Sequence, residues 1–124
     1  MKKLPFLLIL ILFNSCNLIQ EKGIDFKIIN NSDSQISNVK ISTSENLDSI
    51  TFEEIVPKDY REDFLSMKQN KVDGHYTLSY TRQDDTTVNE NHGYYTNGGS
   101  LESWICFEIQ NDTTLVKYGN FIDY

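Results

Sequence analysis

From residue 24 onward the chain consists of short stretches in which apolar and polar residues alternate, separated by clusters of Asn, Asp, Gly and Ser. In Ile24–Ile28 and in Ser103–Ile109 the alternation is regular, so every second side chain shares a face. A repeat of two residues is typical of a β-strand with one buried face. The chain also contains no alanine, the strongest helix former, and is rich in Ile, Thr, Tyr and Phe. The pattern predicts an all-β protein.

The same reasoning predicts about seven strands in all. Tyr60–Lys68 fits either a strand that pairs with the segment after it or a short helix that begins at Asp59, and the strand is favoured. A polar loop with a weak strand is expected over Arg82–Glu90. The other predicted strands are residues 38–43, 49–55, 75–81 and 114–118, with turns at Pro57-Lys58-Asp59, Asp73-Gly74 and Asn97-Gly98-Gly99.

Strands at this spacing, with no helical pattern between them, predict an antiparallel β-sandwich of the immunoglobulin-like or transthyretin-like type. The length of 124 residues is enough for one small domain. We assign residues 24–124 to that domain.

The first residues have a different composition. Lys2 and Lys3 precede an apolar run from Leu4 to Phe13, which has the layout of a secretory signal peptide. The run is too short to span a membrane, since a spanning helix needs about 20 residues. We therefore expect export and removal of this segment.

The residues Phe13-Asn14-Ser15-Cys16 that follow resemble the lipobox of bacterial lipoproteins. Ser15 and Cys16 match the pattern strictly, whereas the family prefers Leu and a small residue at the first two positions. The resemblance implies removal of residues 1–15, a lipid anchor on Cys16 and acylation, for example with palmitate, of the new N-terminus. An ordinary signal peptide with an incidental cysteine is the alternative.

Asn17 follows the cysteine, which by the sorting rule of such lipoproteins implies the outer membrane; whether the protein faces the periplasm or the cell surface stays open. Residues 16–23 then form the lipidated N-terminus and a tether, whose last seven residues reach at most roughly 23 Å at ~3.3 Å each. The Asn-Asn-Ser after the first strand, the corner at Pro57 and the Asp73-Gly74 turn loosely resemble small β-sandwich lipoproteins of uncharacterised role.

Lipidation of Cys16 would leave Cys106 without a disulfide partner. Because Cys106 lies in an apolar stretch, we expect a buried, unreactive thiol.

The charge of the chain limits its partners. Removal of Lys2 and Lys3 with the signal segment changes the formal net charge from −7 to −9. A body this acidic would repel phosphate, so a nucleic-acid partner is not expected. No later apolar run approaches the ~18 residues of a membrane-spanning helix, so the only membrane contact expected is the lipid anchor.

Catalytic and metal-binding patterns are weak. His75 and His92, the only histidines, stand in no catalytic motif, and neighbouring carboxylates such as Glu53 and Glu54 would point to opposite faces of a strand. The stretch 84–92 is rich in oxygen ligands but lacks the spacing of a calcium loop. We expect no enzyme, cofactor or metal, and a solvated loop over 84–92.

The candidate binding residues are Tyr94, Tyr95, Asn97 and Trp104. Clustered tyrosines beside a turn can form a stacking platform for a sugar ring or a protein. Alternatively, one tyrosine packs into the core and Asn97-Gly98 closes a hairpin. The sequence thus suggests a lipid-anchored, non-enzymatic envelope protein that binds protein or glycan through loops. An immunity or inhibitor lipoprotein that neutralises a basic toxin or enzyme is the alternative.

Overall fold

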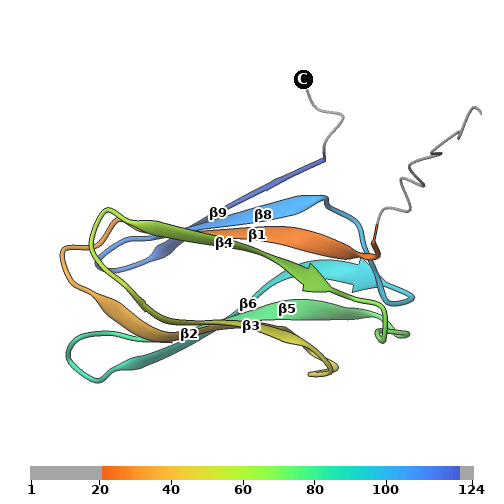
Figure 1. Cartoon of the computed structure of the whole chain (residues 1–124), viewed down its shortest axis with the longest axis horizontal. Helices are drawn as coiled ribbons and strands as arrows, with labels where there is room; N and C mark the ends of the chain where they lie inside the picture. The colour runs from red at the N-terminus through yellow and green to blue at the C-terminus, as the bar shows by residue number, and fades with distance from the viewer. Residues whose placement is uncertain (1–20, 121–124) are drawn as a thin grey trace, which may run out of the picture.

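The structure, a computed structural model, describes residues 21–120, and all regular secondary structure in this range is β-strand (Figure 1). Two sheets pack face to face as a β-sandwich. One sheet has the order β4 (Tyr60–Ser66), β1 (Gly23–Asn30), β8 (Trp104–Ile109), β9 (Thr114–Gly119). The other has the order β3 (Ser49–Ile55), β2 (Ile36–Thr43), β5 (Gly74–Thr81), β6 (Thr87–Thr96), β7 (Gly99–Ser100). The all-β prediction is confirmed.

Three of the assigned segments fall partly or wholly outside the described residues. The signal peptide, Cys16 and residues 17–20 of the tether precede them, and residues 121–124 of the assigned domain follow them. Because residues 21–120 contain no helix, that range offers none long and apolar enough to cross a membrane.

The number and pairing of the strands differ from the prediction. The described range holds nine strands rather than about seven, because β7 is a separate two-residue strand and β6 begins at Thr87, inside the predicted polar loop. The sandwich is also not wholly antiparallel, since β1 pairs with β8 in parallel. Parallel pairing is possible because most of the chain lies between these two strands and provides the crossover.

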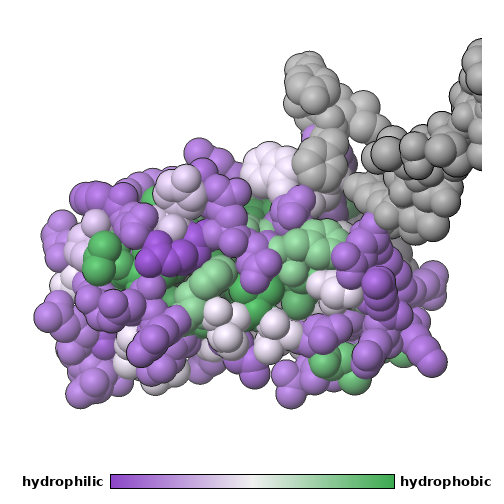
Figure 2. Space-filling view, viewed as in Figure 1, coloured by the Kyte–Doolittle hydropathy of each residue, from purple (hydrophilic) through white to green (hydrophobic). Residues whose placement is uncertain are grey.

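The core lies between the sheets and contains alternate apolar residues of the strands. Tyr76, Leu78 and Tyr80 of β5 are buried, as are the alternate residues of β8. The ring of Phe26 packs edge-on against Tyr76 at 5.3 Å between centroids and stacks with Phe107 at 5.9 Å. Such burial of aromatic area stabilises the contact between the sheets. Figure 2 shows the apolar residues as a band between the sheets, bordered by hydrophilic residues.

Residues 60–66 of the segment 60–68 form a strand, as favoured, but the predicted pairing partner is wrong. β4 pairs with β1 and not with β5, the strand that follows it. Leu65 of β4 lies opposite Ile24 of β1, and both side chains face the core from the four-stranded sheet, whereas β5 belongs to the five-stranded sheet. The expected hairpin at Asp73-Gly74 is therefore absent from the described chain: the connection from β4 to β5 crosses between sheets, and Gly74 already belongs to β5.

The predicted loop over 82–90 is shorter than expected. A turn near Asp85, with a positive φ of 66°, leads directly into β6 at Thr87. The local composition is polar because every second residue of this stretch faces outward, as Thr87 and Asn89 do.

The start of β1 and the β6–β7 turn lie at the same end of the sandwich (Figure 1). Lys22 Nζ donates to the carbonyl of Asn70 at 3.1 Å, and Gly98 N donates to the carbonyl of Val72 at 2.9 Å. The segment 70–72 thus contacts both the beginning of the described chain and the turn.

Candidate functional site

Tyr95 belongs to the core. Its side chain is fully buried, its ring packs against Tyr76 at 5.5 Å, and its hydroxyl donates to Glu45 Oε2 at 2.9 Å. Asn70 Nδ2 donates to the same carboxylate oxygen at 2.7 Å. Tyr95 therefore does not belong to an exposed stacking platform. It is the tyrosine that packs into the core, which was the alternative prediction.

Tyr94 and Asn97 lie at the surface around the carboxylate of Asp73. The Tyr94 side chain is 49% exposed, and its hydroxyl donates to Asp73 at 2.9 Å. Asn97 N at 2.8 Å and Thr96 Oγ1 at 3.0 Å donate to the other oxygen. These hydrogen bonds hold the pKa of Asp73 below its usual value, and the bond from the Asn97 backbone has the largest effect. The geometry fits a role in bracing the turn.

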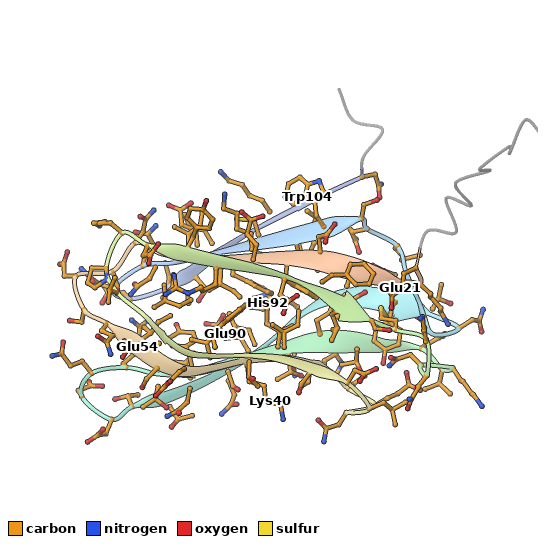
Figure 3. The ribbon with its side chains drawn as sticks, in the orientation of Figure 1. Glu21, Lys40, Glu54, Glu90, His92 and Trp104 are labelled. Atoms are coloured by element: carbon orange, nitrogen blue, oxygen red, sulfur yellow. The ribbon has the colours of Figure 1, made fainter. Side chains whose placement is uncertain are left out.

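Trp104 lies elsewhere, on the outer face of the four-stranded sheet (Figure 3). Tyr95 points between the sheets and Tyr94 lies at the turn. The four candidate binding residues therefore lie in three different places. Of the four, only Trp104 lines one of the pockets of the described chain.

We call the outward side of the sheet β4-β1-β8-β9 the outer sheet face. Its side chains form rows across the strands, because neighbouring strands pair in register. One row contains Phe64, Asp25, Trp104 and Gly119, and the next contains Glu62, Lys27, Cys106 and Lys117.

The two large rings of the first row lie over glycines. A Cβ atom at Gly119 would overlap with Cζ2 and Cε2 of Trp104, and one at Gly23 would come within 2.5 Å of Cζ of Phe64. Each glycine therefore allows a ring to lie against the backbone of the adjacent strand. Both rings remain partly exposed, as stacking with a ligand requires.

An open groove of about 520 Å³ runs beside the indole, and we call it the tryptophan groove. It is lined by Asp25, Phe26, Lys27, Glu62, Trp104, Ile105, Cys106 and Lys117. The ammonium group of Lys27 lies 4.4 Å from the ring centroid of Tyr60, in cation–π geometry. Within the described chain, Asp25, Glu62 and Lys117 make no side-chain hydrogen bond or ion pair.

The carboxyl group of Asp25 separates this groove from a second hollow of about 390 Å³, which we call the phenylalanine hollow. It is lined by Glu21, Lys22, Gly23, Asp25, Phe64, Gly99, Ser100, Glu102 and Ser103. Partial burial, and secondarily the nearby charge of Glu62, raise the pKa of Asp25. The two concavities therefore meet at a carboxylate that is partly desolvated.

Cys106 was expected to be buried, but it lies half-buried in the tryptophan groove. It occupies the outward position of β8 because Ile105 and Phe107 on either side fill the core. Desolvation raises the pKa of its thiol, which lowers the fraction of reactive thiolate at neutral pH.

His92 and Glu90 lie on the inward side of β6, between the sheets (Figure 3). Their side chains are 2.9 Å apart at His92 Nε2 and Glu90 Oε2, and Thr114 Oγ1 donates to Glu90 at 3.1 Å. The His92 ring packs on Phe107 with centroids 5.2 Å apart. Neither residue lines the two concavities above.

The oxygen-rich stretch 84–92 does not converge on one point. Asp84 and Asp85 belong to the turn, whereas Glu90 and His92 face inward and Asn91 outward. Within residues 21–120, no group of three His, Cys, Asp or Glu side chains is arranged to hold a metal ion.

Another pocket, of about 400 Å³, lies between loops at the end of the sandwich opposite Gly98 and includes Ser32, Arg82 and Asn111. The Arg82 guanidinium already donates to the Tyr80 hydroxyl at 3.1 Å and to the Gln110 carbonyl at 3.2 Å. Its charged group is thus engaged internally, and the outer sheet face is the better candidate site.

Sequence reasoning identified Trp104 but missed Phe64, Asp25 and the charged residues around them. Their alternation was visible, but the strands that carry them are far apart in sequence. Only a prediction that β1 lies between β4 and β8 would have shown that they share one face.

No protein-family model matches the chain, and no curated protein matches it in sequence. Among solved structures it is similar to one described as an NMR structure of a protein from Eubacterium rectale. The TM-score is 0.52 and the sequence identity is 13%, and the match covers 82% of this chain and 94% of the other. At this identity the similarity concerns the fold alone.

Proposed function

We propose that this protein is a lipid-anchored, non-enzymatic binding protein of the cell envelope that contacts protein or glycan through the outer sheet face. The single observation that carries the binding proposal is the Trp104 indole, which lies on Gly119 beside an open groove. Aromatic side chains of this kind provide large, rigid contact area. The anchor on Cys16 and the outer-membrane location rest on the lipobox resemblance.

Of the two sandwich types considered, we propose the transthyretin-like one. An immunoglobulin domain keeps its first two strands in the same sheet. Here β1 and β2 lie in different sheets, and the first strand pairs with β8 in parallel. This strand order argues against the immunoglobulin-like alternative.

If lipidated, the chain would orient its sandwich with respect to the membrane. Lys22 and the β6–β7 turn share one end, so a short tether would direct Tyr94 and Asn97 toward the bilayer. The row that contains Phe64 and Trp104 crosses β1 at Asp25, two residues after Gly23, so this row would lie near the same end and face along the side of the sandwich.

A binding experiment with envelope fractions tests the proposal. The full chain in mild detergent is mixed with peptidoglycan, outer-membrane protein or lipopolysaccharide fractions, and its retention is measured. We expect Trp104→Ala to reduce retention and Lys40→Ala, on the outer side of the opposite sheet (Figure 3), to leave it unchanged. Equal retention of both variants and the unchanged protein would contradict a role for the outer sheet face.

One observation favours the alternative of an immunity or inhibitor lipoprotein. β3 and β4 are edge strands on the same side of the sandwich, and they expose Glu53, Glu54, Glu62 and Asp63. Such an acidic edge suits a basic partner, although edge charges also prevent edge-to-edge aggregation. Binding of a basic toxin or enzyme would weaken steeply with ionic strength, whereas aromatic contacts would respond little.

A further inference from the structure

We infer that the outer sheet face binds a neutral oligosaccharide that spans two aromatic rings, Trp104 in the tryptophan groove and Phe64 in the phenylalanine hollow. This inference rests on the proposed function and specifies its ligand class.

The spacing of the rings supports a ligand of several sugar units. Phe64 and Trp104 are both paired with Asp25, from the strands on either side of β1. Their Cα atoms are therefore two strand spacings apart, about 10 Å. A disaccharide or trisaccharide spans such a distance, whereas a single sugar contacts one ring only.

The fixed orientation of each ring makes it suited to stacking. Trp104 lies against Gly119 and Phe64 against Gly23, so each ring is held in contact with the backbone of an adjacent strand. A pyranose places its C–H groups against the open face of such a ring, and its hydroxyl groups then point sideways to polar side chains.

The polar groups around the rings suit hydroxyl ligands. Asp25 lines both concavities and has no side-chain partner within the described chain. Glu102 Oε2, in the phenylalanine hollow, is one of the two buried side-chain N or O atoms within residues 21–120 that lack a hydrogen-bond partner. A buried carboxylate oxygen without a donor is costly, and a sugar hydroxyl in the hollow would supply that donor if the Glu102 side chain turned this oxygen toward it.

The charge of the two concavities favours a neutral ligand. Four carboxylates and three ammonium groups line them together, so neither a polyanion nor a polycation is matched. The acidic protein as a whole would repel anionic polymers. A polyhydroxylated neutral chain satisfies both kinds of group by hydrogen bonding.

The test uses the only tryptophan of the chain as its probe. The full chain in mild detergent is titrated with chitohexaose, cellohexaose and the corresponding monosaccharides while Trp104 emission is recorded. We expect saturable binding of at least one hexasaccharide and binding at least tenfold weaker for its monosaccharide. Phe64→Ala is expected to weaken hexasaccharide binding roughly tenfold while leaving monosaccharide binding unchanged.

Calorimetry with Trp104→Ala and with the control Tyr94→Ala completes the design. Loss of binding in the first variant and retention in the second supports the inference, provided that circular dichroism shows both to be folded. If neither hexasaccharide binds while envelope retention still depends on Trp104, the oligosaccharide inference is overturned and the proposed function stands. If retention does not depend on Trp104, the proposed function itself fails.

Discussion

The indole of Trp104 covers the backbone of Gly119, its register partner on the adjacent strand. Ser103 N, just before the tryptophan, donates to the Gly119 carbonyl at 2.9 Å and holds the two strands together at this point. A small residue on an edge strand thereby determines how the only tryptophan is presented.

Replacement of Gly119 by alanine should displace the indole. Its Cβ would overlap with ring atoms of Trp104, so we expect a loss of about 1–3 kcal/mol in the free energy of unfolding and a red shift of tryptophan emission. Lys117→Ala, on the same face of β9, is the matched control. An unshifted spectrum in Gly119→Ala would contradict the ring position.

The β6–β7 turn offers a sharper comparison of two adjacent glycines. Gly98 has φ +72°, and a Cβ there would overlap with the Asn70 backbone, whereas a Cβ at Gly99 would lie 3.6 Å from the nearest atom. We expect Gly98→Ala to reduce the free energy of unfolding by about 2–4 kcal/mol and Gly99→Ala by less than about 0.5 kcal/mol. Denaturant titration of both variants measures the difference.

Tyr94 and Tyr95 should differ strongly in their contribution to stability. Truncation of the buried Tyr95 to alanine is expected to cost about 3–5 kcal/mol, because it leaves a cavity beside Tyr76. Tyr94→Ala removes an exposed ring and should cost less than about 1 kcal/mol. Similar melting temperatures for the two variants would refute this assignment of inward and outward tyrosines.

The carboxylate of Glu45 should make stability depend on pH. Desolvation acts to raise its pKa, but hydrogen bonds from Asn70, from two backbone amides and from Tyr95 together lower it. A group with a depressed folded-state pKa stabilises the fold above its unfolded value, here 4.5, and this contribution is lost as pH falls through the folded pKa.

Glu45→Gln should therefore lower stability at pH 7 and lose less stability than the unchanged protein between pH 5 and about pH 3. Glu53→Gln, which removes one exposed charge from β3, is the control. Thermal unfolding as a function of pH tests this, and parallel curves for Glu45→Gln and the unchanged protein would count against the carboxylate network.

The anchor can be tested directly in cells. If Cys16 carries the proposed lipid, metabolic labelling with a palmitate analogue should mark the unchanged protein, and Cys16→Ala should abolish the label. Cys106→Ser controls for acylation at the other cysteine. Label that persists in Cys16→Ala would exclude the lipoprotein assignment.

Local patterns predicted much of the fold. β3 was predicted with its observed bounds, and the alternating faces of β5 and β8 were identified, although Cys106 on the outward face of β8 was expected to be buried. The alternation is predictable because a two-residue repeat shows which side chains share a face, whatever the partner strand. The same pattern could not show whether Tyr94 or Tyr95 points inward. Adjacent residues on a strand face opposite sides, and two neighbouring tyrosines are equally suited to the buried side.

The sequence by itself determined that this chain forms strands with one apolar face, and it singled out Trp104 and the cysteine pattern at residue 16. Only the tertiary structure decided that β1 lies between β4 and β8, and hence that Phe64, Asp25 and Trp104 form one row. Strand pairing depends on which remote faces bury one another best and on backbone hydrogen bonds between them. Neither the packing of remote faces nor the hydrogen bonds between strands can be predicted from any single stretch of sequence.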